Sequence, residues 1–382
     1  MIFLTPEIGI PPRYLTRHIG IFGATGTGKT TTAAAIAERL PCTILILDVK
    51  GDLESMGKLY RPWQAQLRIK DLGADLIARA LDLSAAQAGA LQVAMAWAED
   101  SNWIVDNLAD LRMLLGNTVI KARDLSATYG LVSPVSVAAV QRGLLRLERT
   151  VPWAFGSAVV DWRNVTGRAV LSCSAIAGVP GLYGATVAHI LDSLYRGLGE
   201  LGDVPAPGLM VMIDEAHLVF DGATPSIVRR IEQITRLIRS KGVGLIYVTQ
   251  SPADLPDVIA GQLTTRIQHG LRAATARQQK GLRAAAETMP GNVTMQDILR
   301  LGTGQAIVSV PDYRGVPQPG RAVMVTRGDV PLVPVEAELP PPVARTVIWE
   351  KEEEEPAAVG RSPWYLWPLI IVVIVYGSLL FV

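Results

Sequence analysis

The chain has 382 residues, of which 49% are hydrophobic and 19% charged, so it can bury a core and is not a disordered chain. Its 36 basic residues nearly balance its 35 acidic residues, which excludes nucleic-acid binding through a strong overall positive field. Any DNA contact must therefore come from local patches. The two cysteines, Cys42 and Cys173, lack metal-ligand spacing and are expected to be free thiols.

A strand, a glycine-rich loop and a helix follow one another near the start of the chain. Ile19–Phe22 is an apolar strand, and Lys29–Leu40 has the pattern of a helix that Pro41 ends. Thr43–Val49 is a continuous apolar run, which is typical of a strand buried on both faces. This order predicts a parallel strand–helix–strand unit.

The loop fits the pattern G-x-x-x-x-G-K-[ST] in full. Its glycines allow backbone N–H groups to face phosphate oxygens, and the following helix N-terminus favours an anion. We therefore expect ATP to bind here, with Lys29 on the β- and γ-phosphates and Thr30 on Mg²⁺. The predicted nucleotide site consists of Gly23, Ala24, Thr25, Gly26, Thr27, Gly28, Lys29, Thr30 and Thr31.

A helical insertion is predicted over residues 76–149. The segment is rich in alanine and leucine at helical spacing, and no clean strand interrupts it. Its aromatic residues, Trp97 and Trp103 among them, are interpreted as core rather than as ligand contacts.

Alternating strands and helices resume after the insertion and predict a doubly wound, mostly parallel sheet, which gives the chain an α/β fold. The predicted strands are Ala169–Ser172, Leu209–Ile213, Val243–Thr249, Ile267–Leu271 and Ala306–Val310, and the predicted helices are Gly184–Leu198 and Pro225–Lys241.

Two carboxylates follow the apolar strand Leu209–Ile213. Ligands bind at the carboxyl ends of the strands in open α/β sheets, so Asp214 and Glu215 are expected at the nucleotide. We expect Asp214 to hold Mg²⁺ and Glu215 to act as general base on the attacking water. The alternative is a surface acidic pair that caps the strand.

Polar residues end two further strands. Gln250 follows the strand after the acidic pair and is interpreted as a sensor of the γ-phosphate or as a ligand of the attacking water; the alternative is a turn residue before Pro252. Asp48 ends the second strand, where a place near the metal and a plain turn remain equally open.

Arginines supply candidate contacts to a neighbouring subunit. Arg266 and Arg272 are candidates for an arginine finger that completes the neighbour's site, with a structural ion pair as the alternative. The predicted helix Pro225–Lys241 carries five basic residues that face either a pore, a neighbour or solvent. These are Arg229, Arg230, Arg236, Arg239 and Lys241.

The composition changes after the ATPase domain predicted for residues 1–330. Residues 331–362 are proline-rich and acidic, which predicts an extended linker. Residues 363–382 carry no charge and begin with Trp364, Tyr365 and Trp367, which predicts a membrane-spanning tail anchor. A buried terminal helix and a hydrophobic interface peptide are the alternatives. Because ATP is cytosolic, the ATPase domain is expected in the cytoplasm.

Several stretches resemble the HerA-like branch of the HerA/FtsK superfamily of hexameric P-loop ATPases. They are Arg17-His18, the loop Gly23–Thr30, Asp48–Leu53, Asp214–Leu218, Arg236–Gly244, Val248–Gln250, Gln262-Leu263 and Arg266–His269. The resemblance implies a RecA-like core, a homo-oligomeric ring of six subunits, nucleotide sites between subunits, and DNA as the polymer moved.

The leading functional prediction is a membrane-anchored oligomeric ATPase that couples ATP hydrolysis to DNA translocation. One alternative is an ATPase that drives protein or virion assembly and export with a membrane protein partner. Another is an ATP-dependent switch or scaffold.

Overall fold

The computed structural model describes residues 1–6, 8–179, 181–221 and 225–327, which belong to one compact unit. The predicted linker 331–362 and the predicted tail 363–382 lie outside the described residues. Within the described ranges, no helix is both long enough and apolar enough to cross a bilayer.

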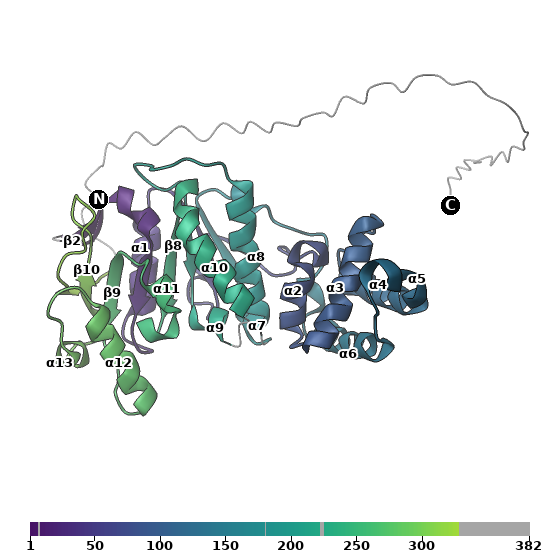
Figure 1. Cartoon of the computed structure of the whole chain (residues 1–382). Coiled ribbons are helices and arrows are strands. Elements are labelled where there is room, and N and C mark those ends of the chain that lie inside the picture. The colour runs from purple at the N-terminus through teal and green to yellow at the C-terminus, as the bar shows by residue number, and fades with distance from the viewer. Residues whose placement is uncertain (7, 180, 222–224, 328–382) are drawn as a thin grey trace, which may run out of the picture. The chain divides into compact units, whose positions relative to one another are not determined.

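The centre of the fold is a nine-stranded sheet in the order β11-β10-β9-β3-β8-β7-β4-β6-β5 (Figure 1). The strands from β9 to β5 are parallel, and β10 and β11 add to the β9 edge in antiparallel pairing. The bounds are β3 Ile19–Phe22, β4 Thr43–Asp48, β5 Lys58–Tyr60, β6 Arg168–Ser172, β7 Leu209–Ile213, β8 Val243–Thr249, β9 Thr265–His269, β10 Gln305–Ser309 and β11 Arg321–Met324. The mostly parallel α/β sheet predicted from the sequence is confirmed.

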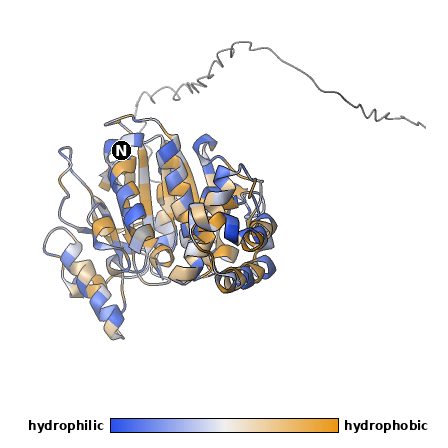
Figure 2. Ribbon diagram, turned by 45° about the vertical axis from the view of Figure 1, so that its right-hand side comes forward, coloured by the Kyte–Doolittle hydropathy of each residue, from blue (hydrophilic) through white to orange (hydrophobic). Residues whose placement is uncertain are grey.

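Helices cover both faces of this sheet, as a doubly wound fold requires. Alternate residues of β4 show the division, because Ile44 and Ile46 pack in one core and Leu45 and Leu47 in the other. The first core lies against α1 (Lys29–Arg39) and the hairpin β1–β2 (Ile2–Thr5 and Ile8–Ile10), and the second lies against α8 (Leu182–Gly197) and α10 (Pro225–Leu237). Figure 2 shows hydrophobic strands between helices whose outer faces are hydrophilic.

The predicted insertion is helical and shares its core with the sheet. Its helices are α2 Ile69–Ala80, α3 Ala85–Asp100, α4 Leu108–Ile120, α5 Ala122–Tyr129 and α6 Pro134–Thr150, so it begins earlier than predicted. Leu111 and Leu114 are fully buried in the same hydrophobic cluster as sheet residues. Trp97 is buried as predicted, whereas Trp103, whose ring is tilted against that of Trp97, is 36% exposed.

Several boundaries differ from the sequence prediction for physical reasons. β9 begins two residues before the predicted strand because Thr265 and Arg266 are polar and give no apolar signal. α10 ends at Leu237, and Ile238–Lys241 forms a 3₁₀ turn that Gly242 closes with a positive φ of 70°. The remaining α-helices of the described residues are α7 Ser174–Ala177, α9 His217–Phe220, α11 Asp257–Ala260, α12 Ala276–Thr288 and α13 Met295–Leu299.

Candidate active site

The glycine-rich loop joins the end of β3 to the start of α1. Gly23, Gly26 and Gly28 have φ values of 153°, 80° and 115°. These conformations favour glycine because a side chain at such φ values is strained. The turned backbone and the N-terminus of α1 therefore form the anion-binding cradle that the motif predicted.

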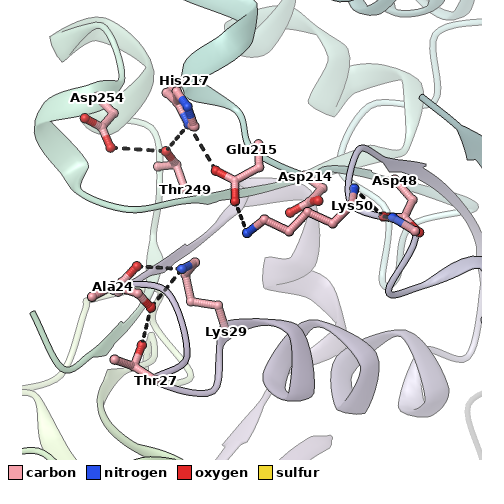
Figure 3. A network of polar contacts seen from close by, with 12 residues as sticks. Ala24, Thr27, Lys29, Asp48, Lys50, Asp214, Glu215, His217, Thr249 and Asp254 are labelled. Carbon is pink, nitrogen blue, oxygen red and sulfur yellow. Dashed lines mark hydrogen bonds and ion pairs between the residues drawn. The ribbon is translucent and has the colours of Figure 1, made fainter. Parts of the chain in front are cut away.

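Lys29 occupies the centre of this cradle. Its side chain is buried, and its Nζ donates to the carbonyl oxygens of Gly23 at 2.6 Å and Ala24 at 3.0 Å (Figure 3). Thr27 Oγ1 donates to the same Ala24 oxygen at 2.7 Å. Burial lowers the pKa of Lys29, and the nearby charge of Lys50 lowers that pKa further. A bound phosphate would therefore meet a lysine that the loop already holds in place and whose charged form burial disfavours.

The acidic pair lies at the carboxyl tip of β7. Asp214 and Glu215 are 7% and 5% exposed, and Tyr183 donates its hydroxyl to the Asp214 carbonyl at 2.7 Å. Burial, and then the charge of Glu215, raise the pKa of Asp214 to about 6. Glu215 has a φ of 44°, a conformation that non-glycine residues rarely adopt and that is often kept at functional sites.

Two side chains hold the Glu215 carboxylate. Lys50 forms an ion pair with its Oε1, and His217 Nδ1 lies 3.2 Å from its Oε2 (Figure 3). Burial by itself would raise the pKa of Glu215, but the contacts with His217 and Lys50 bring it down to about 2. Thr249 extends the network, because its Oγ1 lies 3.4 Å from His217 and donates to Asp254 at 3.2 Å.

Asp48 organises the turn that carries Lys50. One carboxylate oxygen accepts from the N–H groups of Lys50 at 3.1 Å and Gly51 at 2.9 Å, and the other accepts from Leu53 at 2.8 Å. All three bonds belong to the turn. Neither Lys50 nor His217 was predicted from the sequence. The contact of Lys50 with Glu215 depends on the strand order, and that of His217 depends on the conformation of the turn after β7.

Gln250 follows β8, between the strand of the glycine-rich loop and the strand of the acidic pair. Its carbonyl accepts from Gly23 N at 3.0 Å, so its main chain is joined to the cradle. A cleft of about 670 Å³ opens beside it, and exposed Arg272 lines this cleft. Six of its lining residues are Ala24, His217, Gln250, Asp254, Arg272 and Lys280.

Arg266 lies in β9 and binds main-chain oxygens of its own subunit. Its guanidinium donates to the carbonyls of Ala260 at 2.8 Å and Leu263 at 3.3 Å. Its side chain is half-buried, and burial lowers its pKa. The assignment of Arg266 or Arg272 as a finger for a neighbouring subunit stays a prediction.

The basic residues of α10 and its 3₁₀ extension divide into two groups. Three form ion pairs: Arg230 with Asp192, Arg239 with Asp203, and Lys241 with Glu200. Arg229 and Arg236 are exposed and lie two helical turns apart. A pore or neighbour role therefore stays open for this second pair, whereas the first three have structural partners.

The oxygen donors at the cradle fit Mg²⁺. Thr30 lies half-buried in the first turn of α1, while Thr25 and Thr31 are exposed. The raised pKa of Asp214 beside Glu215 reflects burial and an excess of negative charge, which a cation would relieve. In the described part of the chain no cluster of three or more acidic, histidine or cysteine ligands exists. Mg²⁺ usually takes one or two carboxylates from a protein and completes its shell with phosphate and water.

A family model described as helicase HerA-like C-terminal matches residues 5–64 and 62–340. The chain belongs to this family. DNA double-strand break repair helicase HerA of Sulfurisphaera tokodaii is 24% identical to this HerA-like chain over 326 residues, which are 79% of the chain and 64% of the relative. The helicase of the same name from Pyrococcus furiosus is 34% identical over 101 residues, or 26% of the chain and 18% of the relative. The HerA-like chain thus spans less than two thirds of these curated relatives.

Solved structures show the same fold at low identity. The bacterial conjugative coupling protein TrwB matches with a TM-score of 0.62 at 15% identity, over 85% of the HerA-like chain and 88% of TrwB. VirB4 of Thermoanaerobacter pseudethanolicus matches with a TM-score of 0.58 at 17% identity, over 82% and 90%. These likenesses establish the α/β P-loop fold and do not by themselves assign an activity.

Proposed function

We propose that the HerA-like chain hydrolyses ATP with Mg²⁺ and uses this reaction to move DNA through a ring of its own subunits. The observation that carries the proposal is Glu215, a buried carboxylate with positive φ at the tip of β7, beside Asp214 and close to the lysine of the glycine-rich loop. A carboxylate in this place is suited to accept the proton of a water that attacks the γ-phosphate.

The remaining groups take roles that follow from their places. Lys29 contacts the β- and γ-phosphates, and Thr30 and Asp214 hold the metal, which neutralises phosphate charge. Gln250 senses the γ-phosphate or orients the water from the tip of β8. Arg266 or Arg272 serves a neighbour's site. The TrwB structure with ADP and Mg²⁺ supports a nucleotide–metal pair in a relative of this fold.

DNA as the polymer is supported by the relatives from Sulfurisphaera tokodaii and Pyrococcus furiosus, which are described as DNA double-strand break repair helicases. A ring, with a hexamer as the expected form, comes from the same resemblance. For the membrane, the support is the sequence alone: we propose that residues 363–382 anchor the chain and that the ATPase domain faces the cytoplasm.

The test is ATP hydrolysis by the full-length chain in detergent, with and without duplex DNA, across about 50 to 200 mM salt. We expect DNA to stimulate hydrolysis, and this stimulation to weaken as salt rises. Glu215→Gln should lower the turnover number by about 100-fold or more. Glu99→Gln, an exposed acid in the insertion, is the matched control and should behave as wild type.

Two outcomes separate the alternatives. Hydrolysis that Glu215→Gln abolishes but DNA does not change would remove the DNA-motor proposal and favour an export motor with a membrane partner. Slow hydrolysis that neither DNA nor membranes change would favour a switch or scaffold.

A further inference from the structure

Lys50 is a second lysine at the phosphate cradle that the predicted ATPase chemistry leaves without a role. It lies in the turn after β4, and β4 is the neighbour of β7 in the sheet, so the tips of the two strands are adjacent. Its ammonium group reaches across to the Glu215 carboxylate on the side that faces Lys29 (Figure 3). Its charge also acts on the Lys29 ammonium group.

The backbone of Lys50 is fixed, whereas its side chain is not packed in. Asp48 accepts hydrogen bonds from the main-chain N–H groups of Lys50, Gly51 and Leu53 and so anchors the turn. The Lys50 side chain itself is 35% exposed. A lysine is a point charge on a flexible four-carbon stem, so it can change partner while its backbone stays in place.

The contact with Lys50 opposes the chemistry expected of Glu215. A carboxylate that accepts a proton from water needs a free oxygen, but one oxygen of Glu215 is paired with an ammonium group. The other oxygen is buried, makes no hydrogen bond within the described residues and lies 3.2 Å from His217 Nδ1, so it faces the histidine and not the cradle (Figure 3). An incoming γ-phosphate carries more negative charge than Glu215, and the role expected of Lys29 would place it near this lysine, on which the charge of Lys50 also acts.

We propose that Lys50 is a positioning residue that exchanges partners: it holds Glu215 when the site lacks a nucleoside triphosphate and moves to the γ-phosphate when one binds. This exchange frees Glu215 for its water only when the γ-phosphate is present. The inference rests on the proposed function, because it assigns a role within the same ATPase site. Its specific consequence is that Lys50 distinguishes a triphosphate from a diphosphate, which lacks the acceptor.

The test measures binding, without turnover, of fluorescent ADP and of a fluorescent non-hydrolysable ATP analogue to the full-length chain. The readout is the dissociation constant for ADP divided by that for the analogue. Lys50→Met should lower this ratio about tenfold, the effect of one charge-assisted contact, and leave ADP affinity unchanged. Lys50→Arg should restore most of the ratio. Lys58→Met, at an exposed lysine on β5, is the matched control and should leave it at the wild-type value.

A double-mutant cycle tests the exchange itself. Glu215→Gln removes both the competition for Lys50 and the repulsion between Glu215 and the γ-phosphate, so it should tighten binding of the analogue. Only the repulsion remains when Lys50→Met is also present, so the gain should then be clearly smaller. A ratio that Lys50→Met leaves unchanged, or a Glu215→Gln gain that is as large without Lys50 as with it, would overturn the inference while the ATPase proposal stands. A wild-type chain that binds neither nucleotide would overturn both.

Discussion

The turn that carries Lys50 depends on one fully buried carboxylate, and its removal gives a sharp test of the site. Asp48 is 0% exposed and accepts three main-chain hydrogen bonds. Burial raises the pKa of Asp48, because a buried charge is costly, and the three N–H groups act against this shift because they stabilise the charged form. A hydrogen bond to a charged group is worth about 1.5–3 kcal/mol, and three that share one acceptor are not additive. We therefore expect Asp48→Ala to lower the free energy of unfolding by about 3 kcal/mol.

Asp48→Asn gives the graded comparison. Its amide oxygen can keep the hydrogen bonds from Lys50 and Gly51. Its NH₂ group, however, would face the N–H of Leu53, so that hydrogen bond is lost and two donors point at each other. The expected loss is about 1–2 kcal/mol. Asp52→Ala, an exposed acid in the same turn, is the control and should stay within about 0.5 kcal/mol of wild type.

The assay is urea unfolding of the full-length chain, followed by circular dichroism, together with nucleotide titration. The alanine variant should also lose the preference for triphosphate over diphosphate, because Lys50 no longer starts from a fixed backbone. A surface substitution usually changes the free energy of unfolding by no more than about 0.5 kcal/mol. If both Asp48 variants change it no more than this, the turn does not depend on this carboxylate and the reasoning fails.

In Gly28→Ala the added Cβ would lie 3.1 Å from the Cα of Gly304, on a residue whose φ is 115°. Nucleotide affinity should therefore fall about tenfold. Gly89→Ala in α3, where the added Cβ meets open space, is the control and should leave the affinity unchanged. Burial lowers the pKa of His18 from 6.5 to about 4, so its protonation favours the unfolded chain. The stability that neutral His18 contributes is present above pH 6.5 and is lost as pH falls toward 4. Between about pH 7.5 and 5, the free energy of unfolding of the wild type should therefore fall by about 2 kcal/mol more than that of His18→Gln. An equal pH dependence of the two proteins would exclude this effect. Leu114→Ala should lower the free energy of unfolding by about 2–5 kcal/mol and keep a single unfolding transition. Met113→Ala, at a residue that is 58% exposed, is the control and should change it little. A separate unfolding transition for the insertion would contradict the shared core.

The central strands were predictable because they are buried on both faces. Ile19–Phe22, Leu209–Ile213 and Val243–Thr249 were predicted with the bounds that the structure has, since each is a continuous apolar run. The edge strands Lys58–Tyr60 and Arg321–Met324 were not, because they are short and mostly half-buried or exposed and carry no such run.

Some residues of the site could be predicted from local sequence motifs, whereas one contact depends on residues that are far apart in the sequence. Lys29 follows from a contiguous motif, and Asp214 and Glu215 follow from their place at a strand end. The contact between Lys50 and Glu215 joins residues from two strands that are far apart in the sequence, so it required the strand order β7-β4. Sequence could show that a lysine stood in the turn after the second strand, but not which carboxylate it would meet.

Glu215 shows how the backbone and the side-chain network depend on each other. Its positive φ falls in the turn directly after β7, where Ala216 N donates to Val248 O of β8 at 2.9 Å. For a non-glycine residue this conformation costs about 1–2 kcal/mol, and glycine would avoid the cost. A carboxylate at this position therefore requires compensation, and its contacts with Lys50 and His217 are the available source among the described residues. If the γ-phosphate takes Lys50 away, part of that compensation is lost at the moment when Glu215 must bind water instead, so triphosphate binding both frees the base and raises its need for a new partner.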